Sequence, residues 1–307
     1  MSSPYLKWRI CSRVNRNIPA VDALRNAWQS LEGSAVESPR RAAEVILSEV
    51  LGIRIPEIYL QENIALDSVQ YKDYFDMVER CRQGVPLTYV VGNVEFMGLK
   101  LVVPRGVFIP RPETETLCEN VLNFLKRPSP LVVADICTGC GAIALALASF
   151  RKDLICYGTD SSPEAVDSAR LNAARLGVSD RVTFFRGDLA QVLKPLNLEG
   201  KLDCLVANPP YVREGEMEVL PHGVRDHEPA AALDGGVDGL KMYWPILEEA
   251  SSLLKCGGLI ALEVGDGQAE HVKEMLTNLS FSRVEVGCDL RGISRFVTGF
   301  KREGERR

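Results

Sequence analysis

The tetrapeptide Asn208-Pro209-Pro210-Tyr211 combines residue types that could hold a planar amide or amine. It follows the apolar run 202–207, which the sequence predicts as a buried strand that the two prolines must end. The side-chain oxygen of Asn208 and the carbonyl of Pro209 can each accept one N–H of an NH₂ group. Because each proline ring fixes φ, these acceptors would be held at low entropic cost. The alternative interpretation is a proline-terminated strand followed by an ordinary loop.

A second segment predicts a strand, a tight turn of small residues and then a helix. The strand 132–136 contains Asp135, and an apolar helical run follows at 142–148. The turn between them holds Cys137, Thr138, Gly139, Cys140 and Gly141. In a doubly wound α/β sheet, such a turn lies at the carboxyl end of the first strand, where small residues let a nucleoside-bearing ligand approach the backbone.

The next two predicted strands also end in polar residues. The run 155–160 ends in Asp160, about twenty residues after the turn, which is a suitable place to accept hydrogen bonds from ribose hydroxyls. The run 182–186 is followed by Asp188 and Leu189. With the strand before Asn208, four successive strand ends would therefore meet at one edge of a sheet.

These four strand ends resemble those of the class I S-adenosylmethionine-dependent methyltransferases, and Asn208 to Tyr211 narrows the likeness to enzymes that methylate amide or exocyclic amino nitrogen. Further segments are similar to the HemK/PrmC family. They are Ser38–Glu44, Arg82–Pro86, Phe108–Glu115, Glu228–Leu233, Gly235–Leu240 and Leu262–Gly265. The resemblance runs from about Asp22 to Phe300 and is most specific in the segment 109–115.

The resemblance implies a seven-stranded, doubly wound, Rossmann-like α/β sheet with a small N-terminal helical domain. It also implies S-adenosylmethionine as the cofactor. The protein substrate would be a class I peptide-chain release factor, methylated on the side-chain nitrogen of the glutamine in its Gly-Gly-Gln loop. We therefore expect cofactor binding at the turn residues with Asp135, Asp160, Asp188, Leu189 and Asn208, and catalysis at Asn208, Pro209, Pro210 and Tyr211.

The sequence leaves three other functions open. A nucleic-acid adenine N6-methyltransferase would need the same Asn-Pro-Pro-Tyr unit, because a flipped adenine also offers an NH₂ group on a planar ring. A glutamine methyltransferase acting on a ribosomal protein is closer in chemistry. A non-catalytic cofactor-binding scaffold is suggested only by Cys137, which stands where the family usually has a glycine. Since cysteine has a Cβ, we expect the backbone there to avoid positive φ.

Two groups of residues could be read as metal or redox sites. The spacing Cys137-x-x-Cys140 is one, although no second such pair accompanies it. The segment 222–228, which contains His222, Asp226, His227 and Glu228, is the other. The simpler interpretation is a small-residue turn and an ordinary polar loop, so we expect no metal.

Composition is that of an ordinary globular chain. Of its 307 residues, 46% are apolar and 25% are charged, and no apolar stretch approaches the length of a membrane span. Nine cysteines lack the spacing of a disulfide framework, which suits a reducing compartment. The net charge of −5 argues against a broad hold on nucleic acid. We expect a cytoplasmic enzyme with no membrane partner and no direct nucleic-acid partner.

The predicted order of segments follows from these patterns. Residues 1–21 form a basic extension, 22–85 a helical substrate-docking domain, 86–104 a β-hairpin linker turning near Gly98, 105–301 the methyltransferase domain and 302–307 a charged tail. The basic extension has a pattern that organelle-targeting peptides share, so an organelle is the alternative location. Apolar spacing and stop signals predict helices from Asp22 to Leu31, Pro39 to Leu51 and Ser68 to Cys81.

Later elements are predicted with the same signals. The segment 213–236 is polar and poorly periodic, so we expect a long loop near the active site. A helix is expected at 240–254 and a strand at 259–264. The runs 283–286 and 295–300 would supply the last two strands, one of them antiparallel.

Overall fold

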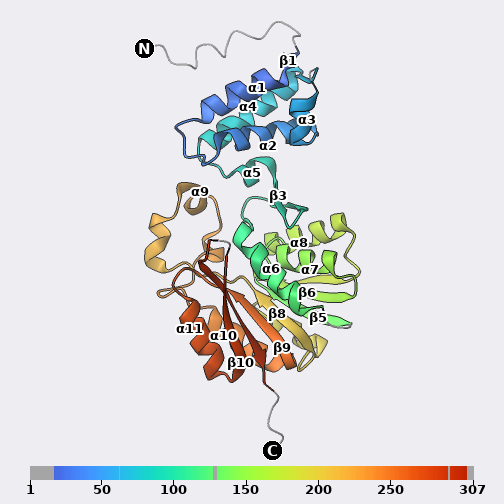
Figure 1. Ribbon diagram of the computed structural model, residues 1–307, viewed down its shortest axis with the longest axis vertical. Helices are drawn as coiled ribbons and strands as arrows, with labels where there is room; N and C mark the ends of the chain where they lie inside the picture. Colours follow the sequence, from blue (N-terminus) through green and yellow to red (C-terminus); the bar gives the residue numbers. More distant parts are fainter. Residues whose placement is uncertain (1–16, 62, 127–129, 290, 303–307) are drawn as a thin grey trace, which may run out of the picture. The chain divides into compact units, whose positions relative to one another are not determined.

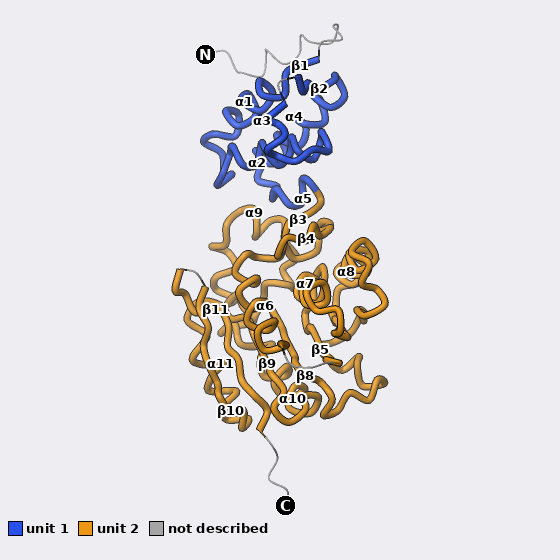
Figure 2. The backbone as a smooth tube through the Cα atoms, turned by 45° about the vertical axis from the view of Figure 1, so that its right-hand side comes forward, with its two compact units in different colours: residues 1–91 blue, residues 92–307 orange. Residues whose placement is uncertain are grey.

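The computed structural model describes residues 17–61, 63–126, 130–289 and 291–302. The chain divides into two compact units, residues 1–91 and 92–307, which are coloured separately in Figure 2. Most of the predicted basic extension and the predicted charged tail lie outside the described residues. In the part of the chain that is described, no helix has the length and apolar character needed to cross a membrane.

The first unit is helical, as predicted. Its helices are α1 (Ala20–Leu31), α2 (Pro39–Leu51), α3 (Ile55–Leu60), α4 (Ser68–Arg82) and α5 (Leu87–Val91), with a short antiparallel pair of strands, β1 (Ile18–Pro19) and β2 (Ala65–Leu66). The apolar stripes predicted as core are buried together in one cluster, with Leu24, Ile46 and Tyr74 among its members. The helices α3 and α5 were not predicted, because five or six residues are too few to show a helical period.

The start and end of α2 illustrate how far the local signals hold. The helix begins at Pro39 and ends before Gly52, which has φ +65°, as its residue types predict. Ser38, predicted to cap this helix, makes no side-chain capping bond. A side-chain cap is present at α4, where Asp67 accepts from the backbone N–H groups of Val69 and Gln70 at 2.8 Å.

The second unit contains the predicted seven-stranded sheet. Its strands are β5 (Leu131–Ile136), β6 (Leu154–Asp160), β7 (Val182–Arg186), β8 (Leu202–Ala207), β9 (Leu254–Glu263), β10 (Phe281–Cys288) and β11 (Ser294–Lys301), in the order β10-β11-β9-β8-β5-β6-β7. Strand β11 is antiparallel to both neighbours, and the other neighbouring strands are parallel, so the expectation of one antiparallel strand is confirmed. Strands β6 and β8 lie on opposite sides of β5. The order in which strands are added to the sheet therefore reverses at β5. Ligands of such sheets bind outside the carboxyl ends of the strands at this switch point.

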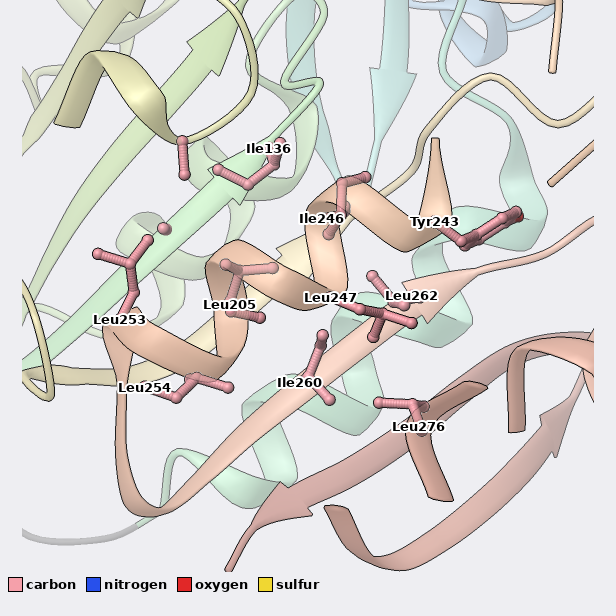
Figure 3. Packing of buried hydrophobic residues seen from close by; sticks show 14 of the residues in the cluster. Ile136, Leu205, Tyr243, Ile246, Leu247, Leu253, Leu254, Ile260, Leu262 and Leu276 are labelled. Atoms are coloured by element: carbon pink, nitrogen blue, oxygen red, sulfur yellow. The ribbon is translucent and has the colours of Figure 1, made fainter. Parts of the chain in front are cut away.

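Helices cover both faces of this sheet. On one face, α6 (Pro112–Phe124), α7 (Ala142–Phe150) and α8 (Pro163–Leu176) lie side by side (Figure 1). The other face carries α10 (Tyr243–Leu253) and α11 (Ala269–Asn278). Figure 3 shows α10 packing its apolar side, including Ile246 and Leu247, against β9 residues such as Ile260 and Leu262. These buried layers fix the strand ends that carry the polar residues.

The predicted hairpin is present and belongs to the second unit. Strands β3 (Asn93–Phe96) and β4 (Leu99–Val102) pair antiparallel, and Gly98 lies in the turn as expected. Val102 donates its N–H to Oδ1 of Asn172, and Nδ2 of Asn172 donates back to the Val102 carbonyl, at 2.8 and 2.9 Å. This reciprocal pair ties the hairpin to α8.

The segment 213–236 differs from the predicted loop. It contains three short helical turns, η3 (Glu214–Val219), α9 (His222–Arg225) and η4 (Ala230–Ala232), and another such turn, η2 (Gln191–Leu196), follows β7. Turns of three to six residues have no sequence period to detect. Strand β9 also starts at Leu254, earlier than the expected start at residue 259.

Candidate active site

One cavity of about 710 Å³ lies at the carboxyl ends of β5, β6, β7 and β8. It is lined by most of the residues that the sequence singled out. These are Cys137, Thr138, Gly139, Cys140, Asp160, Asp188, Leu189, Asn208, Pro209, Pro210 and Tyr211. The four strand ends therefore do meet, and the cavity is large enough for a small-molecule cofactor together with part of a substrate.

Asp135, in β5, and Gly141, the last residue of the turn, do not line the cavity. Oδ2 of Asp135 accepts from the Thr138 hydroxyl at 2.5 Å and from the Ala144 N–H at 3.1 Å. Complete burial raises the pKa of this carboxyl to about 7. Gly141 has φ +85°, and a Cβ there would lie 2.9 Å from a methyl carbon of Leu145. Both residues shape the turn.

Cys137 contradicts the expectation for its backbone, since its φ is +59°. The chain turns there so that the next residue, Thr138, donates its N–H to the Thr159 carbonyl at 2.9 Å. The left-handed conformation costs about 1–2 kcal/mol for a residue with a Cβ. Burial raises the pKa of the thiols of both Cys137 and Cys140, so neither is a ready thiolate. This argues against the redox interpretation of the pair.

Asp160 links the ends of β5 and β6. Its Oδ2 accepts from the Gly139 N–H and its Oδ1 from the Ser162 N–H, both at 2.9 Å. Burial raises the pKa of this carboxyl, although the backbone donors oppose the rise. Each oxygen retains a further lone pair, so the carboxylate can also accept from hydroxyls of a ligand in the cavity. A Cβ built on Gly139 meets no atom within 4 Å, so glycine leaves open space beside this carboxylate.

Asn208 belongs to a hydrogen-bonded chain that leads away from the cavity. Its Nδ2 donates to the Thr114 hydroxyl at 3.3 Å, and that hydroxyl donates to Oε2 of Glu263 at 2.6 Å. The Tyr211 hydroxyl donates to Oε1 of the same carboxylate at 3.4 Å. Because the NH₂ end of the Asn208 amide faces Thr114, its oxygen end can accept from a ligand in the cavity.

A second pair joins two segments of the cavity wall. The side chain of Glu228 is 1% exposed. It accepts hydrogen bonds from Nη2 of Arg111 at 2.5 Å and from the Ile109 N–H at 3.2 Å. The Arg111 guanidinium also lies over the Phe108 ring, 4.8 Å from its centroid. Glu228 is thus committed to an ion pair. His222 lies 2.9 Å from Asp226, and its ring centroid lies 6.3 Å from that of His227. The described residues contain no group of three or more side chains suited to a metal ion.

Sequence reasoning gave no role to Thr114, Arg111 or Glu263. The first two lie in the segment 108–115 and the third in 262–265, and both segments were noted for their resemblance to a family. That resemblance was the available signal. The hydrogen bonds that give these residues a role join positions 94, 117 and 149 residues apart, which no local pattern reveals.

The residues present fit S-adenosylmethionine. Asp160 offers a carboxylate beside a turn that is open at Gly139, and Asp188 and Leu189 line the same cavity. Two family models match the chain. One is described as the PrmC N-terminal domain and matches residues 22–92, and the other is described as a methyltransferase small domain and matches residues 101–222.

The chain is also similar to a solved structure and to two proteins of known family. The "METTL16 MTase domain" has a TM-score of 0.51 at 16% identity, covering 75% of this chain and 81% of that one, which shows the fold alone. The release factor glutamine methyltransferase of Clostridium acetobutylicum is 38% identical and covers 90% of this chain and 96% of its own. That of Moorella thermoacetica is 39% identical and covers 92% and 98%. This chain therefore belongs to the release factor glutamine methyltransferase family of S-adenosylmethionine-dependent methyltransferases.

Proposed function

We propose that this protein transfers a methyl group from S-adenosylmethionine to the side-chain amide nitrogen of the glutamine in the Gly-Gly-Gln motif of a class I peptide-chain release factor. The observation that carries the proposal is the position of Asn208 at the cavity that also holds Asp160, with its amide oxygen left for a ligand. An acceptor for an amide N–H thus lies in the same cavity as the proposed cofactor residues.

The cofactor, when bound, supplies a methyl group on a sulfonium, which is already an excellent leaving group. Asp160 would accept from ribose hydroxyls, and the turn 137–141, with Asp188 and Leu189, would line the rest of its site. Asp135 and Gly141 would act by holding the shape of the turn. The chain's own task is then mainly alignment of the two reactants.

The amide nitrogen is a poor nucleophile, because its lone pair is shared with the carbonyl. Asn208 Oδ1 and the Pro209 carbonyl would each accept one of its N–H bonds, and so stabilise the positive charge that develops on nitrogen. Such preorganised groups are typically worth about 2.7–4 kcal/mol each. Tyr211 would pack against the plane of the amide. Pro210 keeps the unit stiff and offers no competing N–H donor.

The protein substrate calls for a surface beyond the cavity, and we assign docking of the release factor to the helical segment 22–85, with 86–104 as the linker and 105–301 as the methyltransferase domain. Such a substrate is found wherever protein synthesis terminates. We therefore propose a cytoplasmic location, with an organelle as the alternative if the basic segment 1–21 is a targeting peptide.

The test is methyl transfer from labelled cofactor to three candidate acceptors: an intact release factor, ribosomal proteins and DNA. We expect label on the release factor alone, and mass spectrometry should locate it on the glutamine of Gly-Gly-Gln. A release factor with that glutamine replaced by asparagine, which shortens the side chain by one methylene, is the matched control and should stay unlabelled. Label on a ribosomal protein or on DNA instead would overturn the proposal.

A further inference from the structure

Glu263 is a buried carboxylate at the end of β9 whose role the proposed reaction leaves unexplained. It is 2% exposed and does not line the cavity. No cation of the described chain forms a salt bridge with it. Burying an unpaired carboxylate is costly, so a position of this kind calls for a reason.

The two oxygens of Glu263 accept from two residues that both line the cavity. Oε2 accepts from the Thr114 hydroxyl at 2.6 Å, and Oε1 from the Tyr211 hydroxyl at 3.4 Å. The Glu263 carboxylate is therefore separated from the cavity by Thr114 and Tyr211. Its backbone is fixed as well, because Tyr243 donates to the Glu263 carbonyl at 2.9 Å.

The charge on Glu263 decides the direction of the hydrogen bonds in front of it. An ionised carboxylate can only accept hydrogen bonds. The Thr114 hydroxyl therefore uses its single O–H to donate to Glu263. The Thr114 oxygen can then only accept, and the group facing it from Asn208 must be the NH₂ end. The amide oxygen of Asn208 is thereby left for the cavity.

A neutral carboxyl would remove this constraint. It can donate to the Thr114 oxygen, which frees the threonine proton for the oxygen end of Asn208. The Asn208 amide could then turn and present its NH₂ group, which cannot accept from a substrate N–H. An acceptor would be replaced by a donor at the point where the proposed reaction needs an acceptor.

We propose that Glu263 is a positioning residue that acts through Thr114 to fix which end of the Asn208 amide meets the substrate, and that also holds the Tyr211 ring. This inference rests on the proposed function, because it presumes that an amide N–H is the group to be accepted. Glu263 itself does not line the cavity, so it would act through Thr114 and Tyr211.

The surroundings of Glu263 give the relay a pH dependence. Burial raises the pKa of this carboxyl to about 7, while its bonds to Thr114 and Tyr211 lower it. Among nearby charges, Glu113 of α6 raises this pKa and Arg295 of β11 lowers it. Glu263 therefore imposes one orientation on the Asn208 amide above about pH 7 and loses this constraint below it.

Single-turnover methylation of a release factor, with cofactor saturating, tests the relay in four variants. Glu263→Gln keeps the shape but no longer imposes one direction, so the rate should fall about 10-fold, less than the loss of a whole preorganised group. Thr114→Val should fall at least as far, and Thr114→Ser should keep the wild-type rate within a few-fold. Asp203→Asn removes another buried carboxylate, on β8 and paired with Lys255, and should leave the rate unchanged.

The pH profile separates positioning from a structural role. The wild-type rate should fall below about pH 7, as should that of Thr114→Ser, whereas Glu263→Gln should be slow and flat across the same range. Cofactor affinity, measured by calorimetry, should stay within a few-fold in every variant. The pKa of Asp135 is also raised to about 7, and Asp135 is unchanged in Glu263→Gln. If the rate of this variant still falls below about pH 7, the pH dependence belongs to a group other than Glu263.

An NMR measurement that does not depend on methyl transfer completes the test. The side-chain NH₂ resonances of Asn208, in protein labelled with [¹⁵N]asparagine and identified by their loss in Asn208→Ala, should shift with a midpoint near pH 7. They should not shift in Glu263→Gln. The inference would be overturned if Glu263→Gln kept the wild-type rate and its fall below about pH 7. A Thr114→Ser variant as slow as Thr114→Val would also overturn it. An inactive wild type would refute the proposed function instead, and the resonance titration would still decide for or against the relay.

Discussion

Gly139 donates its backbone N–H to Oδ2 of Asp160 at 2.9 Å, so the turn after β5 is bonded to the carboxylate that ends β6. The same carboxylate lines the cavity. One side chain thus fixes the turn and offers its remaining lone pairs to a ligand.

Asp160→Ala should weaken cofactor binding by about 10- to 100-fold, because hydrogen bonds to a charged group are worth about 1.5–3 kcal/mol. Asp234→Ala is the control, since Asp234 also lines the cavity but is paired with Val212, in the segment after β8. Calorimetric titration with S-adenosylmethionine provides the measurement. Equal affinities in the two variants would contradict the placement of the ribose.

Asn208→Ala should lower kcat by about 10²- to 10³-fold, because it removes one of two acceptors at a developing charge, while cofactor affinity stays within a few-fold. Asn208→Asp keeps an acceptor in the same place and should retain more activity than the alanine variant. Single-turnover transfer to a release factor measures both. An aspartate variant that folds and is slower than the alanine variant would argue against the acceptor role.

Cys137→Gly should be more stable than Cys137→Ala by about 0.5–1 kcal/mol, the reverse of the usual order, because φ is +59° at this position. Cys140 has no positive φ, so the same two substitutions there should show the usual order, with alanine the more stable. Urea denaturation of the four variants measures the difference. The same order at both positions would mean that the left-handed turn carries no strain.

The contribution of Asp135 to the free energy of unfolding should fall as pH rises from about 4 to about 7. Its pKa is raised from 3.8 to about 7 by burial, so in this range the folded state holds a proton that the unfolded state releases. The contribution of one such group is about 1.4 kcal/mol per pH unit. Asp135→Asn should flatten the curve measured by urea denaturation at a series of pH values. An unchanged slope would show that Asp135 titrates normally.

A chain beginning at Gly92 should bind cofactor yet methylate an intact release factor poorly. The boundary lies between the two compact units, and it keeps the hairpin that Asn172 holds. Calorimetry with S-adenosylmethionine checks folding and cofactor binding, and transfer to the intact release factor checks docking. Turnover at the full-chain rate would remove the docking role from the helical segment.

The sequence predicts the sheet and the cavity well because their signals are local. Each strand is an apolar run with a turn signal at its end, and the polar residues of the site follow those runs directly, as with Asp160 and Asn208. The backbone of Cys137 was predicted wrongly, because a preference against positive φ of about 1–2 kcal/mol is small beside the bonds that fix the turn. Thr114 and Glu263 were missed because their roles come from contacts between distant segments.

The position of β11 also bears on how the domain is assembled. Although it follows β9 and β10 in the chain, it lies between them and pairs with both. Until it inserts, β9 is an unprotected edge and β10 has no neighbour in the sheet, a state open to pairing with other chains. The strand that carries Glu263 therefore depends for its second partner on a segment that follows β10 in the chain, and such non-local pairing slows folding.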